Sequence, residues 1–75
     1  MPFASYLRGS RFDTDTTRVM GVAFEMVRVA LGHADEGYIK NEVIARHIIE
    51  LAKTGERNPD ILCELVLKEI RSHRP

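Results

Sequence analysis

The stretch that decides the fold is Glu50-Leu51-Ala52-Lys53-Thr54-Gly55-Glu56-Arg57-Asn58-Pro59-Asp60. Its first half is typical of a helix end, because Gly55 tolerates the left-handed conformation that closes a helix and Lys53 places a cation in the last turn. Its second half is typical of a helix start, because Asn58 is a good N-cap and Pro59 fits the first helical position. Stop and start signals this close together predict two helices joined by a tight turn.

The residues on either side of this turn have the spacing of amphipathic helices, which we place at about 38–54 and 59–72. The apolar arc of the first consists of Ile44, Ala45, Ile48, Ile49, Leu51 and Ala52. The apolar face of the second consists of Leu62, Cys63, Val66, Leu67 and Ile70, with Ile61 and Leu65 lying off it. We expect Ile48 to lie at the centre of the core, with Leu51 and Val66 nearby.

The polar faces of the same helices carry charges at helical spacing. Glu42, Arg46 and Glu50 are four residues apart, which predicts a ladder of ion pairs along the first helix. Glu64 and Lys68 have the same spacing and predict one further pair on the second helix.

A longer helix is expected upstream, at about 14–32. Asp13 and Asp15 are both suitable N-caps, and Gly32 is a plausible C-terminal cap. The polar arc of this helix is narrow and consists of Thr17, Arg18, Gly21, Glu25 and Arg28. Most surface helices bury a stripe of roughly 100° or a little more, whereas this one is apolar around about two thirds of its circumference. It must therefore be covered on more than one side.

Two candidates remain for the second cover. If it were absent, a soluble monomer would expose one of two apolar rows, an unusually large patch. The rows are Val19, Val22, Met26 and Val29, or Met20, Phe24 and Leu31. We expect a homodimer in which this helix lies against its own copy, since two-fold symmetry is the commonest closed solution. The alternative is that the N-terminal arm covers that side within one chain, through Phe3, Tyr6, Leu7 and Phe12.

These elements predict an all-α fold, a small three-helix bundle, in which residues 13–75 form a single helical domain. Residues 1–12 form an N-terminal arm with room for one further short helical turn. A chain of 75 residues buries only roughly 60–65% of its unfolded surface, so it is marginal as an isolated domain. Oligomerisation is one usual supplement at this size, which agrees with the expected homodimer.

The sequence predicts no catalytic residue, no metal site and no cofactor, and therefore no enzyme. Its single cysteine, Cys63, lies on an apolar helix face and is read as a buried thiol rather than a nucleophile. His33, Asp35 and Glu36, with His47 further along, are too few and too scattered for a convincing metal site. An unpaired cysteine and the absence of a signal peptide favour the cytoplasm, and no apolar run reaches the ~20 residues of a membrane span.

Charge bears on the remaining function classes. The chain has 11 Lys+Arg and 11 Asp+Glu, so its formal net charge is zero and does not favour nucleic acid as a partner. If 59–72 were a recognition helix, Asp60 and Glu64 would face the phosphates. Arg8 and Arg11 among the aromatics of the arm are a weak basic footprint. We favour a non-enzymatic interaction or structural module, whose protein partner the sequence does not identify. A helix-turn-helix DNA-binding regulator is the alternative.

The run from Ile48 to Cys63 carries a resemblance. Ile48-Ile49-Glu50-Leu51-Ala52-Lys53-Thr54-Gly55-Glu56-Arg57-Asn58-Pro59-Asp60-Ile61-Leu62-Cys63 resembles a signature of short, uncharacterised bacterial helical proteins, which place an acidic residue or Asn before the proline. The match covers less than a third of the chain. It implies a bacterial cytoplasmic helical protein and carries over no activity and no functional residue.

Overall fold

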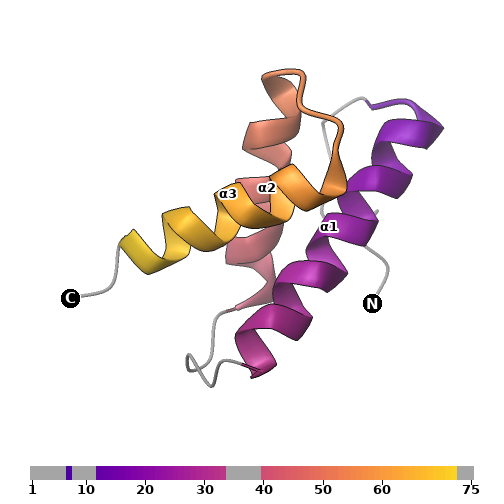
Figure 1. The fold of residues 1–75 in the computed structure, drawn as a ribbon. Helices are drawn as coiled ribbons and strands as arrows, with labels where there is room; N and C mark the ends of the chain where they lie inside the picture. The colour runs from indigo at the N-terminus through magenta and orange to yellow at the C-terminus, as the bar shows by residue number, and fades with distance from the viewer. Residues whose placement is uncertain (1–6, 8–11, 34–39, 73–75) are drawn as a thin grey trace.

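The protein is a three-helix bundle in a computed structural model that describes Leu7 and residues 12–33 and 40–72. The helices are α1 (Thr14–His33), α2 (Asn41–Lys53) and α3 (Pro59–Ser72). Every pair of helices is in contact, and α3 crosses in front of α1 and α2 in Figure 1. The described part of the chain contains no strand, so the predicted all-α class and the three helices are confirmed.

The start of α1 is set by the first of the two predicted caps. The Asp13 Oδ1 accepts a hydrogen bond of 2.7 Å from the backbone N–H of Thr16. Asp15 lies two residues further, in the first turn of α1, where its carboxylate is 3.5 Å from the Arg18 guanidinium. The hydrogen bonds from Thr16, with a smaller effect from the Arg57 guanidinium, hold the pKa of Asp13 below its usual 3.8. Asp13 is therefore the cap, and Asp15 supplies negative charge at the positive end of the helix.

The end of α1 corrects one expectation. Gly32 is not a cap; it is helical, and α1 ends one residue later at His33. Its φ is not positive, since Gly55 is the positive-φ glycine of the described residues. A glycine near the end of an apolar run is compatible with a helical backbone as well as with a cap, so its presence alone did not fix the boundary.

The start of α2 is also later than expected. The predicted helix begins at residue 38, but Lys40 has an extended backbone, with φ −62° and ψ 137°, and α2 begins at Asn41. The Lys40 side chain makes no capping hydrogen bond, and the Lys40 carbonyl accepts hydrogen bonds from the N–H groups of Val43 and Ile44. Tyr38 and Ile39 lie outside the described residues.

The end of α2 confirms the expected turn chemistry. Gly55 has a φ of +105°, and its N–H donates to the Ala52 carbonyl at 3.0 Å. The Thr54 hydroxyl donates to the Leu51 carbonyl at 2.6 Å. The Arg57 guanidinium reaches back and donates to the Ala52 carbonyl at 2.7 Å. The carbonyls of Leu51 and Ala52, in the last turn of α2, are therefore satisfied by residues of the turn.

The start of α3 is closed in the same way. The Glu56 carboxylate accepts hydrogen bonds of 3.1 Å from the N–H groups of Arg57 and Asn58. The Asn58 Oδ1 accepts one of 2.9 Å from the N–H of Asp60, and Pro59 is the first residue of the helix. The polar side chains of this turn thus serve its own backbone, which makes the turn a structural element of the fold.

The core lies where the three helices meet, with Ile48 and Val66 fully buried at its centre as predicted. Leu51 and Ile49 are only half-buried and pack at its edge. The buried apolar residues are Met20, Ala23, Phe24, Val27, Leu31, Ile44, Ala45, Ile48, Ala52, Leu62, Cys63, Val66 and Ile70. Ile61 and Leu65 are exposed, as their place off the apolar face of α3 predicted.

The predicted surface ion pairs do not form. Within the described residues, no ion pair joins Glu42 to Arg46, Arg46 to Glu50 or Glu64 to Lys68; Glu50 pairs instead with Lys53 at 3.6 Å. Exposed pairs of this kind are worth about 0.2–0.5 kcal/mol on a helix. Such small energies do not fix which of several neighbouring partners a flexible side chain takes.

Candidate interaction surface

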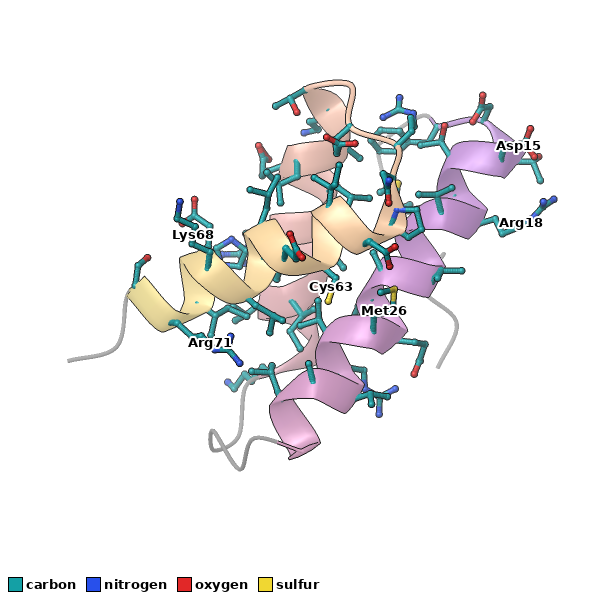
Figure 2. The ribbon with its side chains drawn as sticks, in the orientation of Figure 1. Asp15, Arg18, Met26, Cys63, Lys68 and Arg71 are labelled. Carbon is teal, nitrogen blue, oxygen red and sulfur yellow. The ribbon has the colours of Figure 1, made fainter. Side chains whose placement is uncertain are left out.

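An open, almost wholly apolar hollow runs along the side of α1 that faces away from α2. We call it the α1 groove; its volume is about 780 Å³. Figure 2 shows Met26 of α1 and Cys63 of α3 on the side of the molecule where these two helices cross. The groove is lined by Arg18, Gly21, Val22, Glu25, Met26, Val29, Ala30 and Cys63.

The apolar residues at the centre of the α1 groove include two of the exposed large hydrophobic residues of the structure. Val22 is 46% exposed and Val29 is 55% exposed, while Met26 between them is half-buried. They follow one another at spacings of four and three residues, so they form one line along the helix surface. A line of side chains with this spacing forms a ridge on the helix surface.

The two charged residues of the α1 groove lie together on one edge of this line. Arg18 is paired with Asp15, and the Glu25 carboxylate is 3.0 Å from the Arg28 guanidinium. The side chains in both pairs are 45–87% exposed, so each pair is weak and can be rearranged. Arg28 also lies over the Phe24 ring, with its Cζ 5.8 Å from the centroid.

The structure distinguishes the two apolar rows that the sequence left open. Met20, Phe24 and Leu31 face the core and are buried. Val22, Met26 and Val29 belong to the other row, and they form the α1 groove, with Val19 half-buried beside them. Helical spacing identifies both rows, but the packing of α2 and α3 determines which one is covered.

Cys63 forms the part of the α1 groove that belongs to α3. It is a free cysteine with 7% of its surface exposed, which confirms the predicted burial. Burial raises the pKa of the thiol, and the carboxylates of Asp60 and Glu64 add to this effect. The thiol is therefore protonated at neutral pH, whereas a nucleophilic cysteine needs a lowered pKa. Cys63 contributes apolar surface to the groove.

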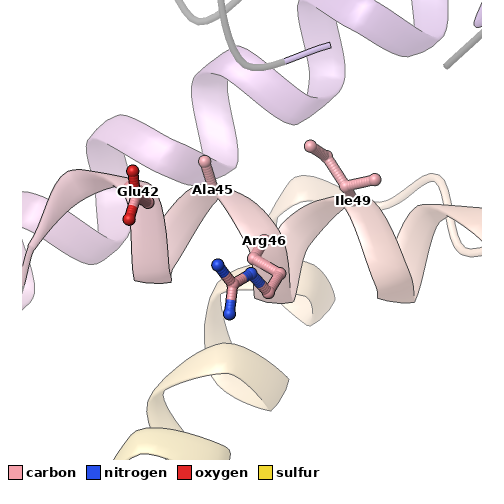
Figure 3. A pocket seen from close by; sticks show the side chains of 4 residues that line it. All are labelled: Glu42, Ala45, Arg46 and Ile49. Atoms are coloured by element: carbon pink, nitrogen blue, oxygen red, sulfur yellow. The ribbon is translucent and has the colours of Figure 1, made fainter. Parts of the chain in front are cut away.

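Two further hollows offer less to a ligand. One of about 290 Å³ lies on α2 and is lined by Glu42, Ala45, Arg46 and Ile49, which Figure 3 shows in successive turns of this helix. The other, of about 230 Å³, lies between α2 and α3 beside Leu51 and Leu65. Neither brings together a nucleophile, a base and an electrophilic group, the set that general acid–base or covalent catalysis requires.

The remaining sequence candidates fall partly outside the described residues. Asp35 and Glu36, two of the four weighed as metal ligands, lie there, and His47 is half-buried on α2. Among the residues with a described position, no three His, Cys, Asp or Glu side chains are grouped closely enough to hold a metal ion. In that same part of the chain, no helix has both the length and the apolar character needed to cross a membrane.

The N-terminal arm is represented by Leu7 and Phe12. Both are partly buried and pack against the core cluster, and neither lines the α1 groove. Phe3 and Tyr6, the other two residues weighed as a cover for α1, lie outside the described residues.

Comparison with protein-family models, with curated proteins and with solved structures gives no match to this chain.

Proposed function

We propose that this protein is a non-enzymatic helical interaction module that self-associates as a homodimer through α1. The α1 groove is the observation that carries the proposal. It is open, almost wholly apolar and centred on two valines whose surfaces are about half exposed. A contiguous apolar surface with a polar rim is typical of an interaction site.

The composition of the α1 groove favours a helix as the occupant. Val22, Met26 and Val29 form a line of apolar side chains with spacings of four and three residues, which matches the ridges of another helix. Burying apolar surface contributes roughly 25 cal/mol per Å², and in a two-fold pair each copy buries the same patch. A second copy of α1 is a partner with that shape and composition.

The alternative is a helix-turn-helix DNA-binding regulator, and the charges of the turn and of α3 argue against it. Asp60 and Glu64 are exposed on the N-terminal half of α3, the half that a recognition helix directs toward DNA. Arg57, the nearest cation before α3, donates its guanidinium hydrogen bonds to the carbonyls of Ala52 and Glu56. The turn therefore places negative charge where phosphates would lie.

We expect no saturable complex with duplex DNA. A fluorescence anisotropy titration at low salt should give only weak, non-specific binding, because the net charge is zero and the N-terminal half of α3 is acidic. A tight complex whose affinity falls steeply as salt is raised would establish the DNA-binding alternative instead.

The self-association proposal is tested with two matched substitutions. Val22 and Ile61 are exposed to similar extents, 46% and 40%, but only Val22 lines the α1 groove. Sedimentation velocity across micromolar concentrations should show a dimer for the native chain and for Ile61→Glu, and a monomer for Val22→Glu. The charge at position 22 would have to be buried unpaired in the dimer, which is strongly unfavourable.

A monomeric native chain would contradict the proposal. Deletion of residues 1–12 then tests the alternative, in which the N-terminal arm covers the exposed side of α1 within one chain. A soluble monomer that loses stability on this deletion would show that the N-terminal arm covers α1.

A further inference from the structure

We infer that the two copies of α1 pair antiparallel, with the two-fold axis between Gly21 and Val22, so that Arg18 of each copy meets Glu25 of the other. The inference rests on the proposed self-association and adds the register, that is, which residues of the two α1 helices lie level with each other. It commits to a second copy of this chain as the occupant of the α1 groove, and the charges along the groove carry it.

Arg18 and Glu25 are placed for such a pairing. They are seven residues apart, about two helical turns and roughly 10.5 Å along the axis, so both lie on the same edge of the α1 groove. A two-fold axis perpendicular to an antiparallel pair sets each edge against the same edge of the other copy. If the axis lies midway between residues 18 and 25, each arginine lies level with the glutamate of the partner. One dimer would then contain two intermolecular ion pairs.

The midpoint between these charges falls between Gly21 and Val22, and both residues line the α1 groove. In this register the Val22 side chains of the two copies lie about 1.5 Å apart along the helix axis, so they would pack against each other at the centre of the interface. Gly21 lies about 100° around the helix from Val22, on the side of the charged edge, where its lack of a side chain leaves Arg18 and Glu25 unobstructed.

Charge also excludes the main competing register. A two-fold axis next to Met26 would set Val22 against Val29 of the partner and bury the apolar line more evenly. The same axis would bring the two Glu25 carboxylates together on one edge, since Glu25 is the neighbour of Met26. Like charges side by side are destabilising across an interface. The register centred on Gly21 and Val22 replaces this repulsion with two attractions.

The existing surface pairs are compatible with this arrangement. Arg18 now lies 3.5 Å from Asp15, and Glu25 lies 3.0 Å from Arg28. A guanidinium has five N–H donors and a carboxylate has two acceptor oxygens, so each can keep its present partner while it takes the intermolecular one. The two intermolecular ion pairs would then lie together along one edge of the dimer.

Disulfide trapping tests the position of the axis. Both cysteine variants are made in a Cys63→Ala background. In the proposed register, the two copies of Val22→Cys lie about 1.5 Å apart along the helix axis, whereas the two copies of Met26→Cys lie about 13.5 Å apart along it. A disulfide requires Cα atoms within about 7 Å. Under mild oxidation, Val22→Cys should form a covalent dimer and Met26→Cys should not. The opposite pattern would place the axis at Met26 and overturn the register. Circular dichroism of each variant confirms that the helices are retained.

Charge reversal tests the ion pairs themselves. Arg18→Glu and Glu25→Arg should each raise the dimer dissociation constant by roughly tenfold, because attractions become repulsions. The double variant should return it close to the native value. If the native chain dimerises and the single reversals have no effect, the register is wrong and the self-association stands. If the native chain is a monomer at all accessible concentrations, both proposals fail.

Discussion

Gly55 and Gly32 have opposite backbone requirements, although both lie near helix ends. Gly55 has a φ of +105°, whereas Gly32 is helical, and an added Cβ would have no neighbour within 4 Å at either position. Any difference between substitutions at the two sites therefore comes from the backbone rather than from steric contact.

We predict that Gly55→Val lowers the free energy of unfolding by about 1–2 kcal/mol, because a β-branched residue is strained at positive φ. The matched control is Gly32→Ala, which should stabilise the protein by roughly 0.5–1 kcal/mol, because alanine is the better helical residue. Urea unfolding at one protein concentration measures both. A native-like stability for Gly55→Val would remove the capping role assigned to this turn.

Asp13 gives the fold a pH-dependent component. Hydrogen bonds from Thr16 lower the pKa of the Asp13 carboxyl in the folded chain below 3.8, the value in the unfolded chain. The ionised carboxylate therefore stabilises the folded state fully at a pH above 3.8. This stabilisation is lost as the pH falls through the lowered pKa of the folded chain. Asn caps a helix without titrating.

Replacing Asp13 with Asn should therefore remove this dependence. We expect Asp13→Asn to become more stable relative to the native chain as the pH is lowered from 5 toward 2. Thermal melts across this range measure it, with Asp15→Asn as the control for the same chemical change in the first turn. A difference that stays constant with pH would show that Asp13 does not cap α1 through its carboxylate.

At the scale of the element, the hairpin of α2 and α3 was predictable because its signals are local. Gly55, Asn58 and Pro59 each act on backbone groups within a few residues, and the structure places all three as expected. The start of α2 was predicted three residues early, and Lys40, the residue before the helix, makes no side-chain capping hydrogen bond that would mark it. The roles of Glu56 and Arg57 in closing the turn were missed; they depend on side-chain geometry that spacing does not give.

The α1 groove could be predicted only in part. Helical periodicity showed that α1 has more apolar surface than one partner helix covers, and it identified both candidate rows. The choice between Val22 and Phe24 as exposed residues depends on how α2 and α3 cross α1, which is a tertiary property. The contribution of Cys63 to the groove follows from the same crossing and was not expected.

For the whole molecule, the small core makes single buried side chains important. Ile48 is fully buried at the contact of the three helices. We predict that Ile48→Ala lowers the free energy of unfolding by roughly 2–5 kcal/mol, through lost burial and the cavity that remains. Ile61→Ala, at a residue 40% exposed, is the control and should have a much smaller effect. Denaturation must be compared at one chain concentration, because the proposed dimerisation would make stability concentration-dependent. Equal effects at both positions would contradict the helical phase of α2.

The central claim is that α1 packs against α1 of a second copy, and an isotope-filtered NMR experiment tests it most directly. Equal amounts of chain with ¹³C-labelled methyl groups and unlabelled chain are mixed, so that the filtered spectrum reports only contacts between copies. We predict cross-peaks from the Val22 methyl groups of one copy to α1 protons of the other. Cross-peaks confined to Ile61 and Leu65, or a spectrum without contacts between copies, would contradict the claim.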